Sequence, residues 1–74
     1  MKLNSDEFDI LKIYITENQT TTVYNLEIAT SFFSDSPHGY LYRMLLNKTK
    51  GMTKDEFVYY VNITKKTIQD IYEQ

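Results

Sequence analysis

Apolar residues recur at helical spacing at the start of the chain. Phe8, Leu11 and Ile15 share one face of a helix that we expect to begin at Ser5 as its N-cap, with carboxylates in the first turn, where the helix dipole favours them. The same segment holds further apolar residues outside this face, so the expected helix is apolar over most of its circumference. Such a helix is usually covered on more than one side. In so short a chain we expect a second subunit to supply the cover.

A second helix is predicted over residues 23–33, after a threonine-rich segment that offers hydroxyl caps. Leu26, Ala29 and Phe33 share one of its faces, and Ile28 and Phe32 flank that face. The helical period of these positions makes an amphipathic helix the natural interpretation.

A third helix is predicted from Pro37 to about Lys50. Ser36 is its expected N-cap, and proline suits the first helical position because its missing N–H would have no partner there. Gly51 is well placed to end the helix in the left-handed conformation. This segment is therefore expected to be a well-delimited helix.

Residues 57–64 read Phe-Val-Tyr-Tyr-Val-Asn-Ile-Thr, which is rich in β-branched and aromatic side chains. Phe57, Tyr59, Val61 and Ile63 alternate onto one face, the period of a strand. We therefore predict a short hairpin, with a first strand over residues 50–53, a tip at 54–56 and a final helix over 65–72. The expected fold is mostly α with a short β-hairpin.

An all-α interpretation stays open. In it, residues 54–61 form a helix, Asn62 is a turn residue, and residues 64–74 are the recognition helix of a tri-helical helix-turn-helix. The β-propensity of residues 57–64 and their alternation favour the strand. The two interpretations differ in whether residues 57–61 are extended or helical.

Three segments resemble the winged helix-turn-helix repressors of the MarR and PadR type. Residues 22–29 resemble the positioning helix, residues 36–45 followed by Gly51 and Met52 resemble the recognition helix and the entry to the wing, and residues 59–66 resemble the returning wing strand. The resemblance implies a single winged-helix domain over residues 1–74, which acts as a small DNA-binding transcriptional regulator. It departs from the family at Thr67, where the family has glycine, and in the two acids of the wing tip.

Composition narrows the functional classes. The 74 residues include no cysteine and one histidine, His38, for which no catalytic partner can be assigned. We therefore expect no enzymatic activity, no metal site and no cofactor. The polar, acidic N-terminus is unlike a signal peptide and no apolar run would span a membrane, so we expect a cytoplasmic protein without a membrane partner.

The charge is distributed unevenly. Residues 1–36 hold two lysines and six carboxylates, whereas residues 37–74 hold six basic residues and four carboxylates. Such asymmetry points to an anionic partner for the second half, here double-stranded DNA with helix 37–50 in the major groove. Arg43 suits guanine and Asn47 suits adenine. The residues expected at the DNA are Thr21, Thr22, Ser36, Gly39, Tyr40, Arg43, Asn47, Lys50 and Lys54.

Two protein contacts are also expected. A homodimer would use the two terminal helices and bind paired half-sites on DNA. Its interface residues are Ile10, Ile13, Tyr14, Ile68, Ile71 and Tyr72. The alternative function is a non-enzymatic protein-interaction module or inhibitor, which would bind its partner at the helix 37–50 face with Leu46 as an anchor.

Overall fold

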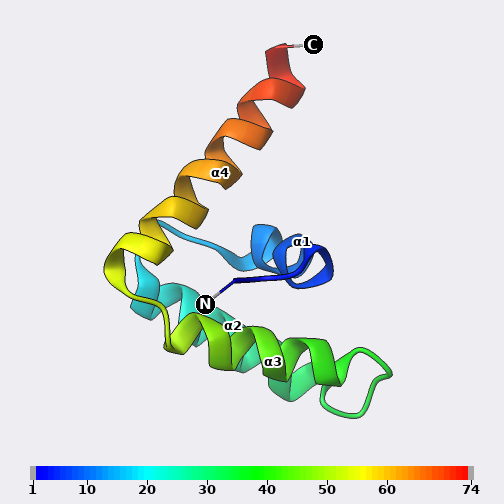
Figure 1. Cartoon of the computed structure of the whole chain (residues 1–74). Helices are drawn as coiled ribbons and strands as arrows, with labels where there is room; N and C mark the ends of the chain where they lie inside the picture. Colours follow the sequence, from blue (N-terminus) through cyan, green and yellow to red (C-terminus); the bar gives the residue numbers. More distant parts are fainter. Residues whose placement is uncertain (1, 74) are drawn as a thin grey trace.

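The computed structural model describes residues 2–73, with side chains described for residues 2–66, and this part of the chain folds into four helices (Figure 1). They are α1 (Ser5–Tyr14), α2 (Gln19–Phe33), α3 (Gly39–Lys50) and α4 (Lys54–Glu73). No strand occurs among residues 2–73. The predicted winged helix is therefore wrong, and the all-helical alternative is confirmed at the level of fold class.

The largest difference from prediction lies in α4, which is one uninterrupted helix (Figure 1). The expected hairpin tip, residues 54–56, forms its first turn, and the expected strand, residues 57–63, forms the turns that follow. Asn62 is also helical, so the turn expected there in the all-α alternative is not formed. Of the recognition helix expected over residues 64–74, residues 64–73 are thus the second half of a longer helix, and residue 74 lies outside the described residues.

Local hydrogen bonds explain why α4 is helical. Thr53 N donates to Glu56 Oε1 at 2.9 Å, and Glu56 N donates to Thr53 Oγ1 at 3.2 Å, which together form a capping box. Phe57, Tyr60 and Thr64 are buried at helical spacing, and Thr64 Oγ1 donates to Tyr60 O at 2.9 Å. The burial of residues that lie three and four positions apart outweighs the strand propensity of these side chains.

The first two helices also begin with side-chain caps. Asn4, one residue before the expected Ser5, caps α1: its Oδ1 accepts from Glu7 N at 2.8 Å, while Asn4 N donates to Glu7 Oε1 at 2.9 Å. Asn18 caps α2, because its Oδ1 accepts from Thr21 N at 2.9 Å. This cap starts α2 four residues earlier than predicted.

Helices α2 and α3 run antiparallel, side by side (Figure 1). At one end, Gln19 Nε2 donates to Thr49 O and Met52 O, each at 3.0 Å. At the other end, the rings of Phe33 and Tyr42 stack with their centroids 4.8 Å apart. The two helices therefore form an αα-hairpin in which α3 lies along α2 over its whole length.

The loop between these helices differs from prediction in its details. α3 begins at Gly39 rather than Pro37, and Ser36 Oγ donates to Phe33 O at 2.8 Å and accepts from His38 N at 3.2 Å. Gly39 is required by a close approach, since a Cβ there would lie 2.7 Å from the carbonyl oxygens of Phe33 and Ser34. The expectation that Gly51 is left-handed is wrong, because its φ is −85°.

The core lies where α1 and the first turns of α4 meet the α2–α3 hairpin. Leu11, Leu26 and Leu45 are fully buried at its centre, one from each of the first three helices. Phe57 and Tyr60 bring α4 into the same cluster. Beyond these turns, α4 extends away from the other helices (Figure 1).

Candidate functional site

The outer surface of α3 carries four of the residues predicted at DNA. Tyr40, Arg43, Asn47 and Lys50 are all exposed and recur at spacings that place them on one face. Arg43 Nη1 donates to Ser34 O at 3.5 Å. We call these four residues the α3 outer face.

The other five residues predicted at DNA do not belong to the α3 outer face. Gly39 is buried against the backbone of the preceding loop, and Thr22 is buried with its Oγ1 accepting from Thr16 N at 2.9 Å. Thr21 and Lys54 are exposed at the starts of α2 and α4, and Ser36 is half-buried in the loop.

Leu46 was expected on the outer surface of α3 as an anchor for a protein partner. It is instead half-buried and packed against the core cluster. The placement expected for Leu46 is wrong because the helix is rotated so that Asn47, rather than Leu46, points outward. The side of α3 that faces solvent is therefore polar apart from Tyr40.

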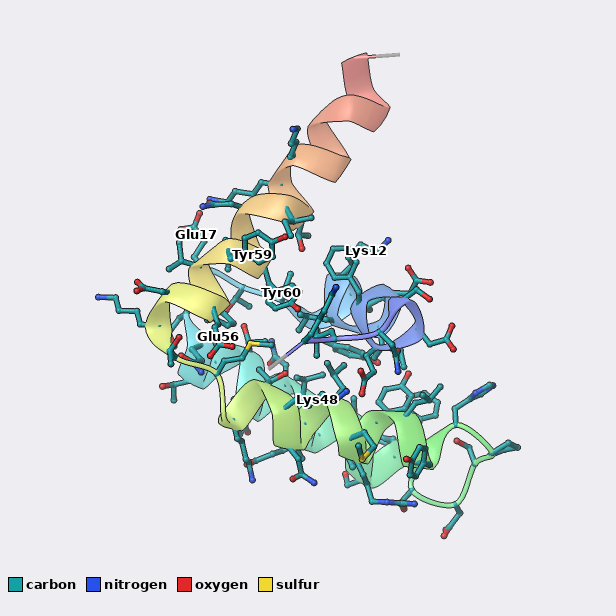
Figure 2. The ribbon with its side chains drawn as sticks, in the orientation of Figure 1. Lys12, Glu17, Lys48, Glu56, Tyr59 and Tyr60 are labelled. Atoms are coloured by element: carbon teal, nitrogen blue, oxygen red, sulfur yellow. The ribbon has the colours of Figure 1, made fainter. Side chains whose placement is uncertain are left out.

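Several of the basic side chains are paired with carboxylates. Lys48 Nζ lies 2.7 Å from Oε1 of the buried Glu7, joining α3 to α1 (Figure 2). On the α3 outer face, Lys50 Nζ lies 3.4 Å from Glu27 Oε1. Lys12 also pairs with Asp9, at 3.0 Å. The α3 outer face therefore lacks a continuous positive strip along its described residues.

A further ion pair joins the α1–α2 connection to α4. Lys65 Nζ donates to Glu17 Oε1 (Figure 2). This hydrogen bond, together with the positive charge of Lys65, lowers the pKa of Glu17 below its usual value. Both side chains are exposed, so the pair is screened by solvent.

The outer surface of α2 has a different character. Glu27 is the one charged residue among the 15 residues of α2. Tyr24, Ile28 and Phe32 follow one another at intervals of four residues and are 60%, 42% and 80% exposed. Residues four apart lie on one side of a helix, so these three form a continuous apolar ridge. We call Tyr24, Ile28 and Phe32 the α2 outer ridge.

A groove runs beside this ridge. It has a volume of about 250 Å³ and is lined by Tyr14, Asn25, Ile28, Ala29, Phe32 and Phe33. Asn25 Nδ2 donates to Tyr14 O at 3.4 Å, which ties α1 to one wall of the groove. Burial, together with the neighbouring Tyr14 hydroxyl, raises the pKa of Tyr42 behind this wall. The walls are neutral and mostly apolar.

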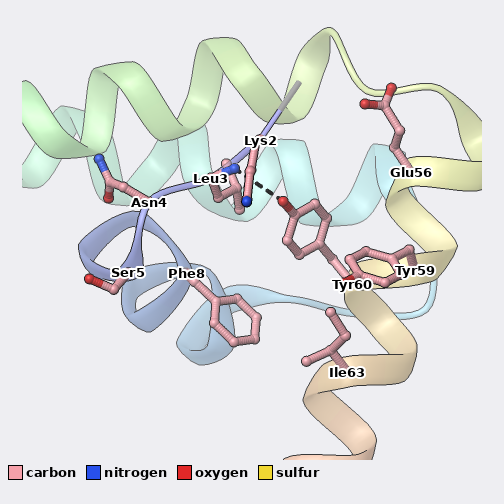
Figure 3. A pocket seen from close by; sticks show the side chains of 9 residues that line it. All are labelled: Lys2, Leu3, Asn4, Ser5, Phe8, Glu56, Tyr59, Tyr60 and Ile63. Carbon is pink, nitrogen blue, oxygen red and sulfur yellow. Dashed lines mark hydrogen bonds between the residues drawn. The ribbon is translucent and has the colours of Figure 1, made fainter.

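A second hollow, of about 520 Å³, lies between the N-terminal segment and α4 (Figure 3). Phe8, Tyr60 and Ile63 supply apolar walls. Of the polar groups that line the hollow, the Tyr60 hydroxyl accepts from Leu3 N at 3.0 Å, and the Glu56 carboxylate caps α4. These polar groups hold the fold together, and we assign this hollow no chemistry.

The residues predicted at a dimer interface differ in their burial. Ile10 and Tyr14 are half-buried and pack against the core of their own chain, whereas Ile13 is 72% exposed. The remaining three residues lie outside those whose side chains are described: Ile68, Ile71 and Tyr72. The structure therefore leaves Ile13 as the exposed member of the predicted set on α1.

No protein-family model, curated protein or solved structure matches the chain. Within the described part of the chain, no group of histidine and carboxylate side chains could hold a metal ion. No described helix is long and apolar enough to cross a bilayer.

The α2 outer ridge is a candidate site that the sequence pattern did not reveal. Ile28 and Phe32 were predicted to flank the face that Leu26, Ala29 and Phe33 share. The signal that identifies them is the combination of an i, i+4, i+8 apolar repeat with a helix that has almost no charge. The site is thus an apolar surface that the rest of the described chain leaves uncovered.

Proposed function

We propose that this chain is a non-enzymatic protein-interaction module that binds its partner through the α2 outer ridge and the adjoining groove. The observation that carries the proposal is the exposure of Tyr24, Ile28 and Phe32 on a helix with one charged residue. Cores of protein interfaces are enriched in aromatic side chains and depleted of charge. Contiguous exposed apolar surface on a small domain marks an interaction site.

The electrostatics of the molecule support a protein partner over DNA. The protein has a formal net charge of −2, and Lys50 on the α3 outer face is paired with Glu27. DNA binding relies on unpaired lysine and arginine side chains that replace counterions at phosphates. The antiparallel α2–α3 hairpin also differs from a helix-turn-helix, in which the second helix crosses the first at a steep angle.

A photo-cross-linking experiment separates the two classes of partner. p-Benzoylphenylalanine replaces Phe32 in one version of the chain and Tyr40 in another, and the adducts formed in the native host are identified by mass spectrometry. We expect an identified protein adduct at position 32, which Ile28→Lys in the same chain abolishes, and no such adduct at position 40. Tyr40 is a suitable control because it is an aromatic residue of similar exposure, at 62%, on the other helix of the hairpin.

The competing proposal, DNA at the α3 outer face, predicts a different outcome. Fluorescence anisotropy with a labelled duplex at about 50 mM salt would then show binding that weakens on Arg43→Ala and with added salt. Such binding, or the lack of any protein adduct at position 32, would contradict the protein-interaction function.

A further inference from the structure

The α2 outer ridge and the groove beside it form a surface that is complementary to itself. Tyr24, Ile28 and Phe32 make one row at intervals of four residues, and Asn25, Ala29 and Phe33 make the neighbouring row. Members of both rows and Tyr14 of α1 line the groove, which therefore lies on the side of the ridge that faces α1. When two helices pack through rows of this spacing, the ridge of each fits the groove of the other, which is the commonest packing class in globular proteins.

We propose that the partner at this surface is a second copy of the chain, related by a two-fold axis that passes close to Ile28. Under two-fold symmetry the same patch is used by both subunits, so the patch must offer both a projection and a recess. The ridge is the projection and the 250 Å³ groove is the recess. This inference rests on the proposed function, of which it specifies the partner.

The charge at this surface also fits self-association. Each copy carries a net charge of −2, so two copies repel one another at most orientations. The α2 outer ridge is a surface where they can meet without burying like charges, because Glu27 is the one charged residue of α2 and is already paired with Lys50.

The available area is sufficient for a dimer. Aromatic side chains bury about 200 Å² each, so the exposed fractions of Tyr24, Phe32 and Phe33 amount to roughly 350 Å² per copy. With Ile28 and the polar rim of the groove added, and both copies counted, the buried area reaches the roughly 1,000 Å² that a specific interface needs. The interface would be of modest size, so the dimer is expected to dissociate on dilution.

Sedimentation equilibrium of the purified full chain, from about 10 to about 500 µM, tests the inference. We expect the wild type to approach twice the chain mass of 8.8 kDa at the upper concentrations. Phe32→Lys should raise the dissociation constant by about 30-fold or more, as for the loss of a hot-spot side chain. Tyr40→Lys, which adds the same charge at an exposed aromatic residue, should leave the dissociation constant unchanged.

A cross-linking measurement guards against variants that misfold. The chain has no cysteine, so Ile28→Cys introduces a single thiol at the centre of the ridge. Mild oxidation should join two Ile28→Cys chains in a disulfide, whereas Tyr40→Cys chains should stay separate. A wild type that remains at one chain mass throughout, or a dimer disrupted equally by both lysine variants, would overturn the second copy as partner. The proposed function would then still stand if position 32 cross-links to a different protein, and would fall if it cross-links to none.

Discussion

The α2 and α3 helices lie side by side and share one core, yet their outer surfaces have opposite chemistry. The α3 outer face carries the polar side chains of Arg43, Asn47 and Lys50, of which Arg43 donates to Ser34 O and Lys50 pairs with Glu27. The α2 outer ridge carries an isoleucine and two aromatic residues exposed to solvent. Exposed apolar surface contributes little to the fold of an isolated chain, so the difference points to α2 as the helix that contacts a partner.

The largest difference in stability is expected between variants on the buried side and on the exposed side of α2. Leu26 is fully buried, so Leu26→Ala should lower the free energy of unfolding by about 3–5 kcal/mol, enough to unfold much of a domain this small. Phe32→Ala removes a larger side chain but one that is 80% exposed, so its effect on the monomer should stay within about 0.5 kcal/mol. Urea denaturation at low protein concentration, followed by circular dichroism, measures both. Equal destabilisation by the two variants would mean that Phe32 belongs to the fold.

Two lysines of α3 allow its buried and exposed sides to be compared in the same way. Lys48→Met leaves the buried Glu7 carboxylate without its partner and should cost about 2–3 kcal/mol, less than a fully enclosed pair because Lys48 is partly exposed. Lys50→Met breaks an exposed pair with Glu27 and should cost less than about 1 kcal/mol. The same denaturation experiment compares them. A Lys50→Met effect as large as that of Lys48→Met would show that the α3 outer face has a structural role.

A smaller effect is expected at the start of α4. Glu56→Ala removes one half of the capping box with Thr53 and should cost about 1 kcal/mol. Asp55→Ala, in the same turn but outside the capping box, is the matched control and should cost less. Thermal unfolding monitored by circular dichroism distinguishes the two.

The failure at α4 has a physical explanation. Phe57 and Val61 fit the alternation of a strand, but Phe57, Tyr60 and Thr64 fit the period of a helix equally well. Local propensity favoured the strand, whereas the burial of the helical set against the core decided the outcome. The Thr-Lys-Asp-Glu segment that forms the capping box was present in the sequence and is a signature of a helix start.

The first three helices could be predicted from their apolar spacing, although their caps could not: Asn4 and Asn18 cap α1 and α2, and α3 begins without a side-chain cap. The candidate site was harder, since α2 has apolar residues on both sides. Leu26 is enclosed and Ile28 is exposed, although their sequence surroundings are similar. Only the placement of α1 and α3 against α2 determines which apolar side is covered.

The most direct test of the α2 outer ridge as the contact surface is a concentration series of ¹⁵N-labelled protein, from about 20 to about 500 µM, observed by heteronuclear NMR. Backbone amides near Tyr24, Ile28 and Phe32 should shift or broaden as the concentration rises. Those of Arg43 and Asn47, on the α3 outer face, should stay unchanged. Shifts confined to the α3 outer face would contradict the assignment of the contact surface to α2, and spectra that do not change with concentration would contradict self-association.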